Sequence, residues 1–268
     1  MDSRELARLM RLDIVEVAHS DHSTHVGGSL SVADILAVLY ADVMAHDPEH
    51  PDAPNRDRLV MSKGHSSTAL YSCLAHSGYI TRDEALSQYE DGTRISGHVS
   101  HKVPGIEVST GALGHGLPIA CGMAYAAKLD GRKHRVFCIL GDGELQEGTS
   151  WEASLFAVRH GLANLTVIVD NNTIQSDASI DEVLGMRDVS GLLSPFGYEL
   201  REVDGHVHDA LRNALRPAET GAPVCVVAHT VKGKGASFAE GRQAFHSAKL
   251  NDAQYAQAIR ELEACDEG

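Results

Sequence analysis

The segment VFCILGDGELQEG (136–148) decides the fold class, because a short apolar run passes directly into a carboxylate flanked by glycines. Two similar apolar runs follow it, LTVIVD (165–170) and VCVVAH (224–229). The three runs are rich in Val and Ile and show no polar alternation, which is typical of strands buried on both faces of a parallel sheet. Helical patterns separate the runs. The sequence therefore predicts an α/β fold, a single doubly wound domain with a mostly parallel sheet and helices on both faces.

Helix starts are predicted from short polar side chains that are followed three residues later by an acidic residue. Four such pairs predict helices over about 3–19 and 32–40 and two further helices, beginning after residues 81 and 149: Asp2 with Glu5, Ser31 with Asp34, Thr81 with Glu84, and Thr149 with Glu152. The Gly- and Ala-rich stretch 111–131 predicts a buried helix at the domain centre or at a subunit interface. No repeat or linker divides the chain, so residues 1–268 are expected to form one domain.

The composition excludes several classes of partner. Among 268 residues, 37 acidic side chains outnumber 23 basic ones, and the formal net charge of −14 disfavours nucleic acid and anionic membranes. No apolar stretch is expected to reach the roughly 18 residues that span a bilayer, and the charged N-terminus is unlike a signal peptide. The five cysteines form no CxxC pair, so we expect a cytoplasmic protein with reduced cysteines.

Two loops carry the oxygen ligands of a predicted metal site. Asp142 follows the first apolar run, and Asn172 and the backbone carbonyl of Ile174 follow the second. Neighbouring parallel strands bring such loops together, and three oxygens leave room for diphosphate and water around Mg²⁺. A dinucleotide-binding G-x-G-x-x-G would need glycine where the chain has Gln146, so that alternative fails.

The two loops together resemble the signature of thiamine-diphosphate-dependent enzymes. That signature is GDG, a spacer and NN, and here 27 residues lie between Gly143 and Asn171. The resemblance implies that Asp142, Asn172 and Ile174 hold Mg²⁺, which in turn holds the diphosphate of the cofactor.

Further segments resemble the N-terminal half of transketolase, in order and from about residue 10 to 256. They are HVGGSLSVADILAVLY (25–40), DRLVMSKGHSSTALYSCLAHSGY (57–79), GHVSHKVPGIEVSTGALGHG (97–116) and AHTVKGKGASF (228–238). The resemblance implies three catalytic histidines, His25 and His246 for proton transfer and His98 near the terminal hydroxyl of the donor. It also implies these cofactor-binding residues: His65, Gly111, Ala112, Leu113, Asp142, Gly143, Glu144, Asn172 and Ile174.

The chain resembles the first subunit of a split, two-gene transketolase. The pyrimidine-binding domain of the family, with its activating Glu, is not recognisable in this sequence. The resemblance therefore implies a partner, the C-terminal transketolase subunit, in a heterotetramer that transfers a two-carbon ketol unit from a ketose to an aldehyde, with sugars or sugar phosphates as substrates. Glu147 and Glu152 match carboxylates that link paired active sites in the family, although either could simply stabilise a helix start.

Other readings stay open at this point. The α subunit of a 2-oxo acid dehydrogenase, another thiamine-diphosphate-dependent carboligase and a non-catalytic paralogue would share GDG and NN. His115 replaces a common glutamine and Ser176 a common apolar residue, which leaves the donor and acceptor undefined. Lys232 and Lys234 in VKGKG do not fit a P-loop, and we expect them in a solvated loop or at the edge of the site.

Overall fold

Five parallel strands form one sheet in the spatial order β1-β2-β3-β5-β4. The structure is a computed structural model, and it describes residues 1–264. The all-parallel pairing confirms the predicted α/β class. The strands are β1 (Arg58–Met61), β2 (Val136–Gly141), β3 (Leu165–Asn171), β4 (Glu199–Asp204) and β5 (Val224–His229).

The three predicted strands are the central ones, and the two that the sequence analysis missed lie at the edges. β3 is buried along its whole length, and β2 and β5 are buried except at their last residue. β4 (ELREVD) is only half-buried, so its polar residues hide the apolar run on which the prediction depended. β1 has only four residues.

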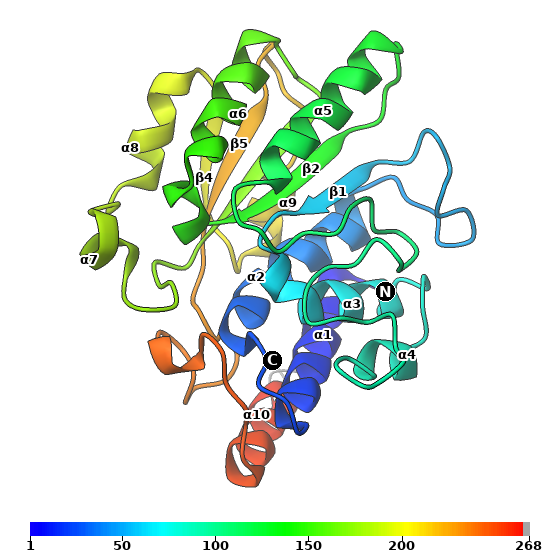
Figure 1. The fold of residues 1–268 in the computed structure, drawn as a ribbon, viewed down its shortest axis with the longest axis vertical. Coiled ribbons are helices and arrows are strands. Elements are labelled where there is room, and N and C mark those ends of the chain that lie inside the picture. Colours follow the sequence, from blue (N-terminus) through cyan, green and yellow to red (C-terminus); the bar gives the residue numbers. More distant parts are fainter. Residues whose placement is uncertain (265–268) are drawn as a thin grey trace.

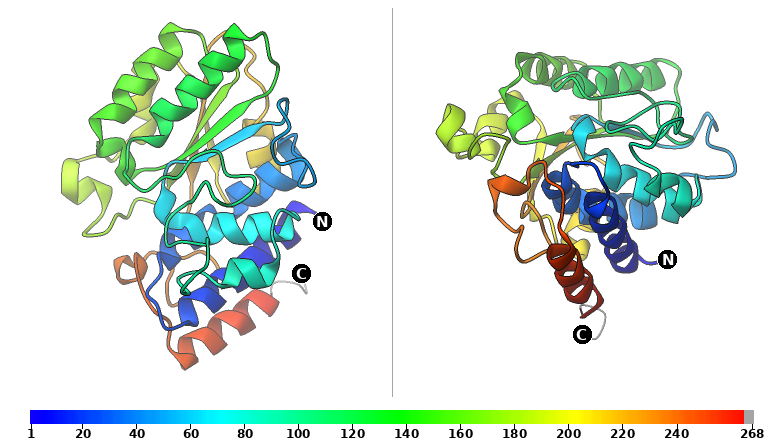
Figure 2. Two further views of the ribbon diagram at one scale, coloured as in Figure 1. Left: turned by 45° about the vertical axis from the view of Figure 1, so that its right-hand side comes forward. Right: turned by 60° about the horizontal axis from the view of Figure 1, so that its bottom comes forward.

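Helices cover both faces of the sheet (Figure 1; Figure 2, right). On one face, α5 (Gly116–Leu129) and α6 (Gly148–Arg159) pack against strand residues such as Cys138 and Leu140. Alternate residues such as Phe137 and Ile139 face the other helical layer. That layer contains α1 (Ser3–His19), α2 (Val26–Val38), α3 (Ser67–His76) and α9 (His208–Ala214).

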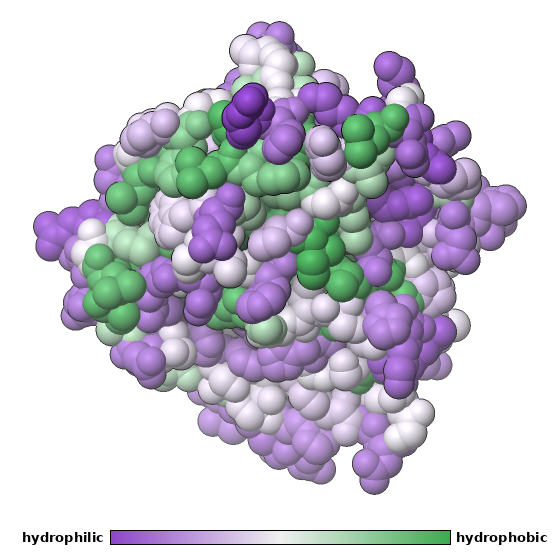
Figure 3. All heavy atoms as spheres, turned by 45° about the horizontal axis from the view of Figure 1, so that its top comes forward, coloured by the Kyte–Doolittle hydropathy of each residue, from purple (hydrophilic) through white to green (hydrophobic). Residues whose placement is uncertain are grey.

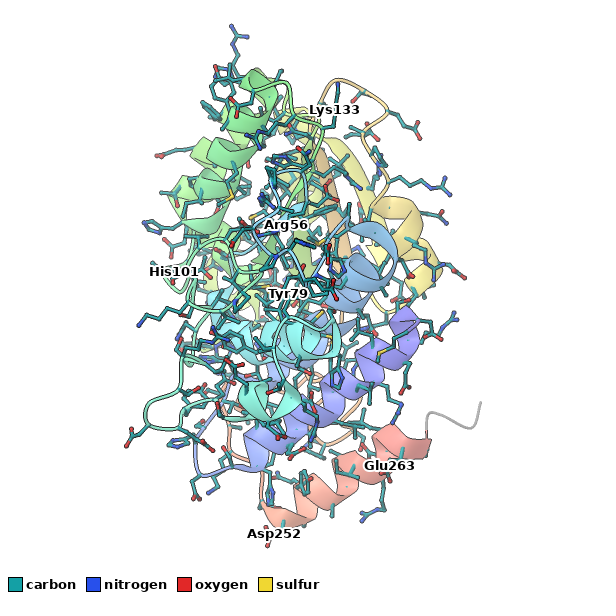
Figure 4. All side chains as sticks on the ribbon, turned by 90° about the vertical axis from the view of Figure 1, so that its right-hand side faces the viewer. Arg56, Tyr79, His101, Lys133, Asp252 and Glu263 are labelled. Carbon is teal, nitrogen blue, oxygen red and sulfur yellow. The ribbon has the colours of Figure 1, made fainter. Side chains whose placement is uncertain are left out.

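The C-terminal helix lies against the N-terminal one. The ring of His19, at the end of α1, stacks on Tyr255 of α10 with 4.3 Å between centroids. Helix α10 spans Asp252–Ala264. Asp252 and Glu263 mark its two ends in Figure 4, at the far end of the molecule from Lys133 in the loop before β2.

The remaining elements are short. They are α4 (Arg82–Leu86), α7 (Ile180–Leu184), α8 (Val189–Leu193), a π-turn (Leu39–Val43) and the 3₁₀ turns Gly64–Ser66, Gly143–Gln146, Ser194–Phe196 and Gln243–Phe245.

Two of the four predicted helix caps are confirmed and two are wrong. Asp2 and Thr81 accept hydrogen bonds from the backbone N–H three residues on. Ser31 instead lies inside α2, which begins at Val26, and its hydroxyl donates to Asp170. Thr149 lies inside α6 and donates to the carbonyl of Gly114. Both hydroxyls are engaged in tertiary hydrogen bonds that helix-start patterns do not anticipate.

One prediction about apolar segments needs correction. Val26–Val43 is long and apolar enough to cross a bilayer, although 83% of it is buried inside the fold, as expected of a core helix. The stretch 111–131 does form the predicted helix, but only one side of α5 is buried, and Leu129 is exposed.

The described cysteines behave as packing residues. Cys73, Cys121, Cys138 and Cys225 are free and buried, whereas Cys265 lies outside the described residues. Burial raises the pKa of the Cys121 and Cys225 thiols to about 12, so both remain protonated at neutral pH.

Candidate active site

A cavity of about 360 Å³ opens at the carboxyl ends of β1, β2 and β3. This is where parallel α/β sheets bind ligands, because loops from several strands converge there. The wall includes His25, Gly28, Lys63, His65, His98, Gly111, Leu113, Gly141, Asp142, Gly143, Glu144, Gln146, Glu147, Asn172, Ile174, Gln175, Ser176, Lys232 and His246.

The three predicted metal donors lie together in this wall. Asp142 accepts a hydrogen bond from the backbone N–H of Thr173, so the loop after β2 directly contacts the loop after β3. Asn172 Oδ1 accepts from the N–H of Ile174 at 3.2 Å. The described residues hold no cluster of three His, Cys, Asp or Glu suited to a metal. The donors here are instead a carboxylate, an amide and a carbonyl, the oxygen ligands that Mg²⁺ prefers.

Asp142 is a buried carboxylate without a cationic partner of its own. Burial, together with the charge of Asp170, raises the pKa of Asp142 to about 6, against the hydrogen bonds from Thr173 and Gly143. A divalent cation beside this carboxyl group would reverse that shift, because it favours the ionised form.

A buried ion pair supports the floor of the cavity. The ammonium of Lys63, after β1, contacts the carboxylate of Asp170 near the end of β3. Ser31 donates to the same carboxylate at 2.6 Å, and Thr230 also donates to it. Burial alone would raise the pKa of Asp170, but Lys63 and these hydroxyls keep it below its usual range. The pair joins α2, β1, β3 and the end of β5, and the sequence analysis predicted none of it.

Four histidines meet in the cavity, although they come from segments more than 200 residues apart. The ring centroid of His25 lies 5.1 Å from that of His65, 5.8 Å from that of His98 and 5.5 Å from that of His246. The structure therefore brings together every histidine that the resemblance assigned to the site.

Three of these histidines are neutral at neutral pH. Burial, and then the charge of Lys232, lowers the pKa of His246 to about 4. Burial and Lys63 lower the pKa of His65 well below its usual value, and burial and His98 lower that of His25. Burial and the positive charges around the cavity thus favour the uncharged form of these imidazoles.

Of the two positions expected for Lys232, a solvated loop or the edge of the site, the structure shows the second. Its side chain is 2% exposed and enters the cavity, where the ammonium donates to the Ile174 carbonyl at 2.7 Å and to Nδ1 of His246 at 2.9 Å. Burial, followed by repulsion from Lys63, lowers the pKa of Lys232 to about 8. No local signal in VKGKG indicates this burial.

The carboxylate of Glu144 is occupied by hydrogen bonds that position a neighbouring loop. It accepts from the N–H of Gly114 at 2.8 Å, from the N–H of Gly141 at 3.2 Å and from the hydroxyl of Ser62. These bonds fix the segment 111–116, of which Gly111 and Leu113 line the cavity. Ala112 between them is exposed outside the cavity wall.

The fold and the site define an α/β protein with a cofactor-sized polar cavity at the strand ends, and comparison with known proteins identifies the family. Residues 2–264 match the family described as "Transketolase, thiamine diphosphate binding domain". The chain belongs to this family. It is a subunit of the transketolase type, as the sequence predicted.

Two relatives are named as transketolase subunits. The chain is 37% identical to an apulose-4-phosphate transketolase subunit of Phocaeicola vulgatus, covering 94% of this chain and 90% of that protein. It is 39% identical to "6-deoxy-6-sulfo-D-fructose transketolase subunit SqwG" of a Clostridium species, covering 89% and 88%.

Single-chain transketolases share the fold of this chain over part of their length. The crystal structure of the Campylobacter jejuni transketolase superposes with a TM-score of 0.90 at 32% identity, over 98% of this chain and 42% of the larger one. The Pichia stipitis enzyme in complex with sedoheptulose 7-phosphate gives 0.88 at 32%, over 98% and 40%. The chain thus spans about two fifths of these single-chain enzymes.

Proposed function

We propose that this chain holds thiamine diphosphate through Mg²⁺ and supplies one part of a two-subunit transketolase active site. The observation that carries the proposal is the convergence of Asp142, Asn172 and the Ile174 carbonyl in one cavity with four histidines. Asp142, Asn172 and the Ile174 carbonyl would hold the metal, whose charge would favour binding of the anionic diphosphate. The ammonium of Lys232, which now bonds the Ile174 carbonyl, would turn toward the anionic phosphates.

Unsatisfied polar atoms in the wall support a polar ligand. Among the described residues, His25 Nδ1, Gln146 Nε2 and Gln175 Oε1 are buried without a hydrogen-bond partner, and all three residues line the cavity. A buried polar atom without a partner is costly, so a ligand that satisfies such atoms gains affinity.

Thiamine diphosphate, when bound, would supply the carbanion chemistry for moving a two-carbon unit from a ketose to an aldehyde. The residues of this chain hold and move protons around that fragment. Because Nδ1 of His246 accepts from Lys232, its proton sits on Nε2, from which it can be donated to a developing alkoxide. His25 provides a neutral imidazole that can accept a proton, and His98 is proposed to bind the end of the donor.

A partner chain completes the proposed enzyme. The two relatives named as transketolase subunits support a C-terminal transketolase subunit as the partner, and we propose that it supplies the pyrimidine-binding domain and its activating Glu. We propose a cytoplasmic heterotetramer with two copies of each chain. Apolar patches are visible on the side of the molecule shown in Figure 3. Leu129 at the end of α5 and Leu155 and Phe156 of α6 are exposed apolar side chains, and we propose that a second copy packs against these two helices.

The substrates proposed are a ketose or ketose phosphate as donor and an aldehyde as acceptor. The named relatives act on apulose 4-phosphate and 6-deoxy-6-sulfofructose, so members of this group differ in their sugar. Transketolase relatives make a 2-oxo acid dehydrogenase subunit the weaker alternative.

Calorimetry and a coupled assay test this function. The chain, co-purified with its C-terminal subunit, should bind thiamine diphosphate only when Mg²⁺ is present and should transfer a two-carbon unit from a ketose to an aldehyde. Binding that is equally tight in EDTA would contradict the metal-bridged mode. A bound cofactor without transfer from any of a panel of ketoses, combined with turnover of a 2-oxo acid, would favour the dehydrogenase alternative.

A further inference from the structure

A second charged centre lies outside the cofactor cavity, around Asp34 of α2. This side chain is 5% exposed and borders a separate cavity of about 430 Å³. Arg11 of α1 holds both carboxylate oxygens, at 3.0 and 2.5 Å. Burial would raise the pKa of Asp34, but Arg11 and two histidines keep it well below its usual range, so the carboxylate stays ionised. The second cavity is the larger of the two, yet Arg11 and Asp34 in its wall already satisfy each other, so we assign it no ligand.

His206 connects this carboxylate to the loop that carries Lys232. Its Nε2 accepts a hydrogen bond from the backbone N–H of Val231 at 2.8 Å. A backbone N–H can only donate, so the ring proton must sit on Nδ1, from which it is donated to Asp34 Oδ2 at 2.6 Å. Both ring nitrogens are therefore occupied, and the neutral tautomer is fixed.

The loop is held on both sides of Lys232. Val231 is bound by His206, the N–H of Gly233 donates to the Gly27 carbonyl at 3.0 Å, and Arg11 Nε donates to the Lys234 carbonyl at 3.1 Å. The backbone of the loop is thus anchored to α1, α2 and the residues that follow β4.

Lys232 needs such anchoring because its position is electrostatically unfavourable. Its ammonium is buried, with the charge of Lys63 close enough to repel it. A buried Lys side chain that is repelled by a neighbouring positive charge regains hydration by rotating toward solvent. A fixed backbone at its Cα atom limits that rotation.

We propose that His206, backed by Asp34, is a positioning residue that fixes the backbone at Val231 and so keeps the Lys232 ammonium in the cofactor cavity. His206 itself lines the other cavity and acts only through Val231. The inference rests on the proposed function in one respect, namely that the ammonium faces a diphosphate.

His208 provides a matched control. Its Nε2 bonds the same carboxylate at 3.0 Å, but its Nδ1 pairs with the hydroxyl of Ser3 at 2.8 Å and not with the loop. Loss of His208 weakens the charged centre without removing the Val231 bond. A purely structural centre would make the two histidines equivalent.

The test uses amine labelling of the full chain with acetic anhydride, read by peptide mass spectrometry. The exposed Lys133 serves as the internal reference. His206→Asn keeps a donor in reach of Asp34 but cannot reach Val231, so it should raise Lys232 labelling about fivefold, whereas His208→Ala should change it less than about twofold. His206→Gln, whose amide oxygen reaches the Val231 N–H, should restore more than half of the protection.

A second measurement tests whether the position of the Lys232 ammonium affects the binding of thiamine diphosphate. Calorimetry with thiamine diphosphate and Mg²⁺, on the chain assembled with its C-terminal subunit, should show about tenfold weaker binding for His206→Asn and an unchanged constant for His208→Ala. Equal labelling of Lys232 in His206→Asn and wild type, or equal increases in the His206 and His208 variants, would overturn the proposal. If the wild-type assembly binds no thiamine diphosphate, the proposed function fails, while the labelling contrast still decides the role of His206.

Discussion

The ammonium of Lys232 donates a hydrogen bond to Nδ1 of His246 over 2.9 Å. A cation and an imidazole in contact disfavour protonation of the ring, since a second positive charge would face the first. This contact fixes the tautomer of His246 and, together with burial, keeps the ring neutral. It also makes the proton affinity of a proposed catalytic group dependent on a residue that the sequence placed in a solvated or site-edge loop.

Replacement of Lys232 by Met should raise the pKa of His246 from about 4, because burial remains but the neighbouring charge is gone. Chemical shifts of histidine labelled at Cε1 measure this directly. Lys234→Met is the control, since Lys234 lies nearer the surface and pairs with Glu240. An unmoved His246 resonance in the Lys232 variant would show that burial alone sets the pKa.

Asp142→Asn should abolish the response of the protein to Mg²⁺ while changing its metal-free stability little. A pKa raised from 3.8 to about 6 means that the ionised carboxylate opposes folding, on the order of 3 kcal/mol at neutral pH. The amide removes that charge, but its NH2 group must face the N–H of Gly143 or of Thr173, each of which donates to one oxygen of Asp142. The two effects oppose each other, so the metal-free variant should melt within a few degrees of wild type. Mg²⁺ should no longer raise the melting temperature, because a charged ligand has been lost. A variant that still responds to Mg²⁺ would refute the metal assignment.

Magnesium affinity should fall in acid, with a midpoint set by Asp142. The ion binds only the ionised carboxylate, so the binding constant should be nearly flat above pH 6 and should drop about tenfold per pH unit well below it. The effect of pH on the stability of the metal-free protein has the opposite sign. The folded state binds the Asp142 proton more tightly than the unfolded state, so this group's contribution to stability falls as pH rises between about 4 and 6. Calorimetric titrations at several pH values check the first statement, and metal-free melting curves of wild type against Asp142→Asn check the second.

Gly27→Ala should destabilise the chain by about 1–3 kcal/mol. A Cβ atom there would lie 2.6 Å from the backbone oxygen of Phe245 and 3.0 Å from Cγ of Lys232, so both segments would have to move. Gly122→Ala is the contrasting helical substitution, because its Cβ would meet nothing within 4 Å, and it should stabilise α5 by up to about 1 kcal/mol. Urea unfolding of the isolated chain measures both. Equal effects would mean that helix propensity, and not the close approach to Phe245, governs Gly27.

The fold was predictable where one physical requirement dominates. β2, β3 and β5 are buried almost throughout, so uninterrupted apolar residues mark them. β4 was missed because an edge strand tolerates Glu and Arg. The start of α2 was misplaced because Ser31, which looks like a cap, is bonded to Asp170, 139 residues away.

The site, like the fold, could be predicted from the sequence only in part. Asp142, Asn172 and the four histidines stand in recognisable motifs, and the structure places all of them in one cavity. The Lys63–Asp170 pair and the entry of Lys232 depend on how distant segments pack, and no local pattern encodes that. Glu144, predicted to contact the cofactor, lines the cavity, and its hydrogen bonds with Ser62, Gly114 and Gly141 are likewise not indicated by any local pattern.

The strands contribute to the cavity only through the residues at or just beyond their carboxyl ends, such as Lys63, Asp142 and Asn172. The interior residues of the strands need only be apolar and of suitable volume, so they tolerate substitution during evolution. The residues at the carboxyl ends of the strands do not. Distant members of the family should therefore be identifiable from a few polar residues at fixed positions after the strands, even where the apolar residues of the strands themselves have been replaced.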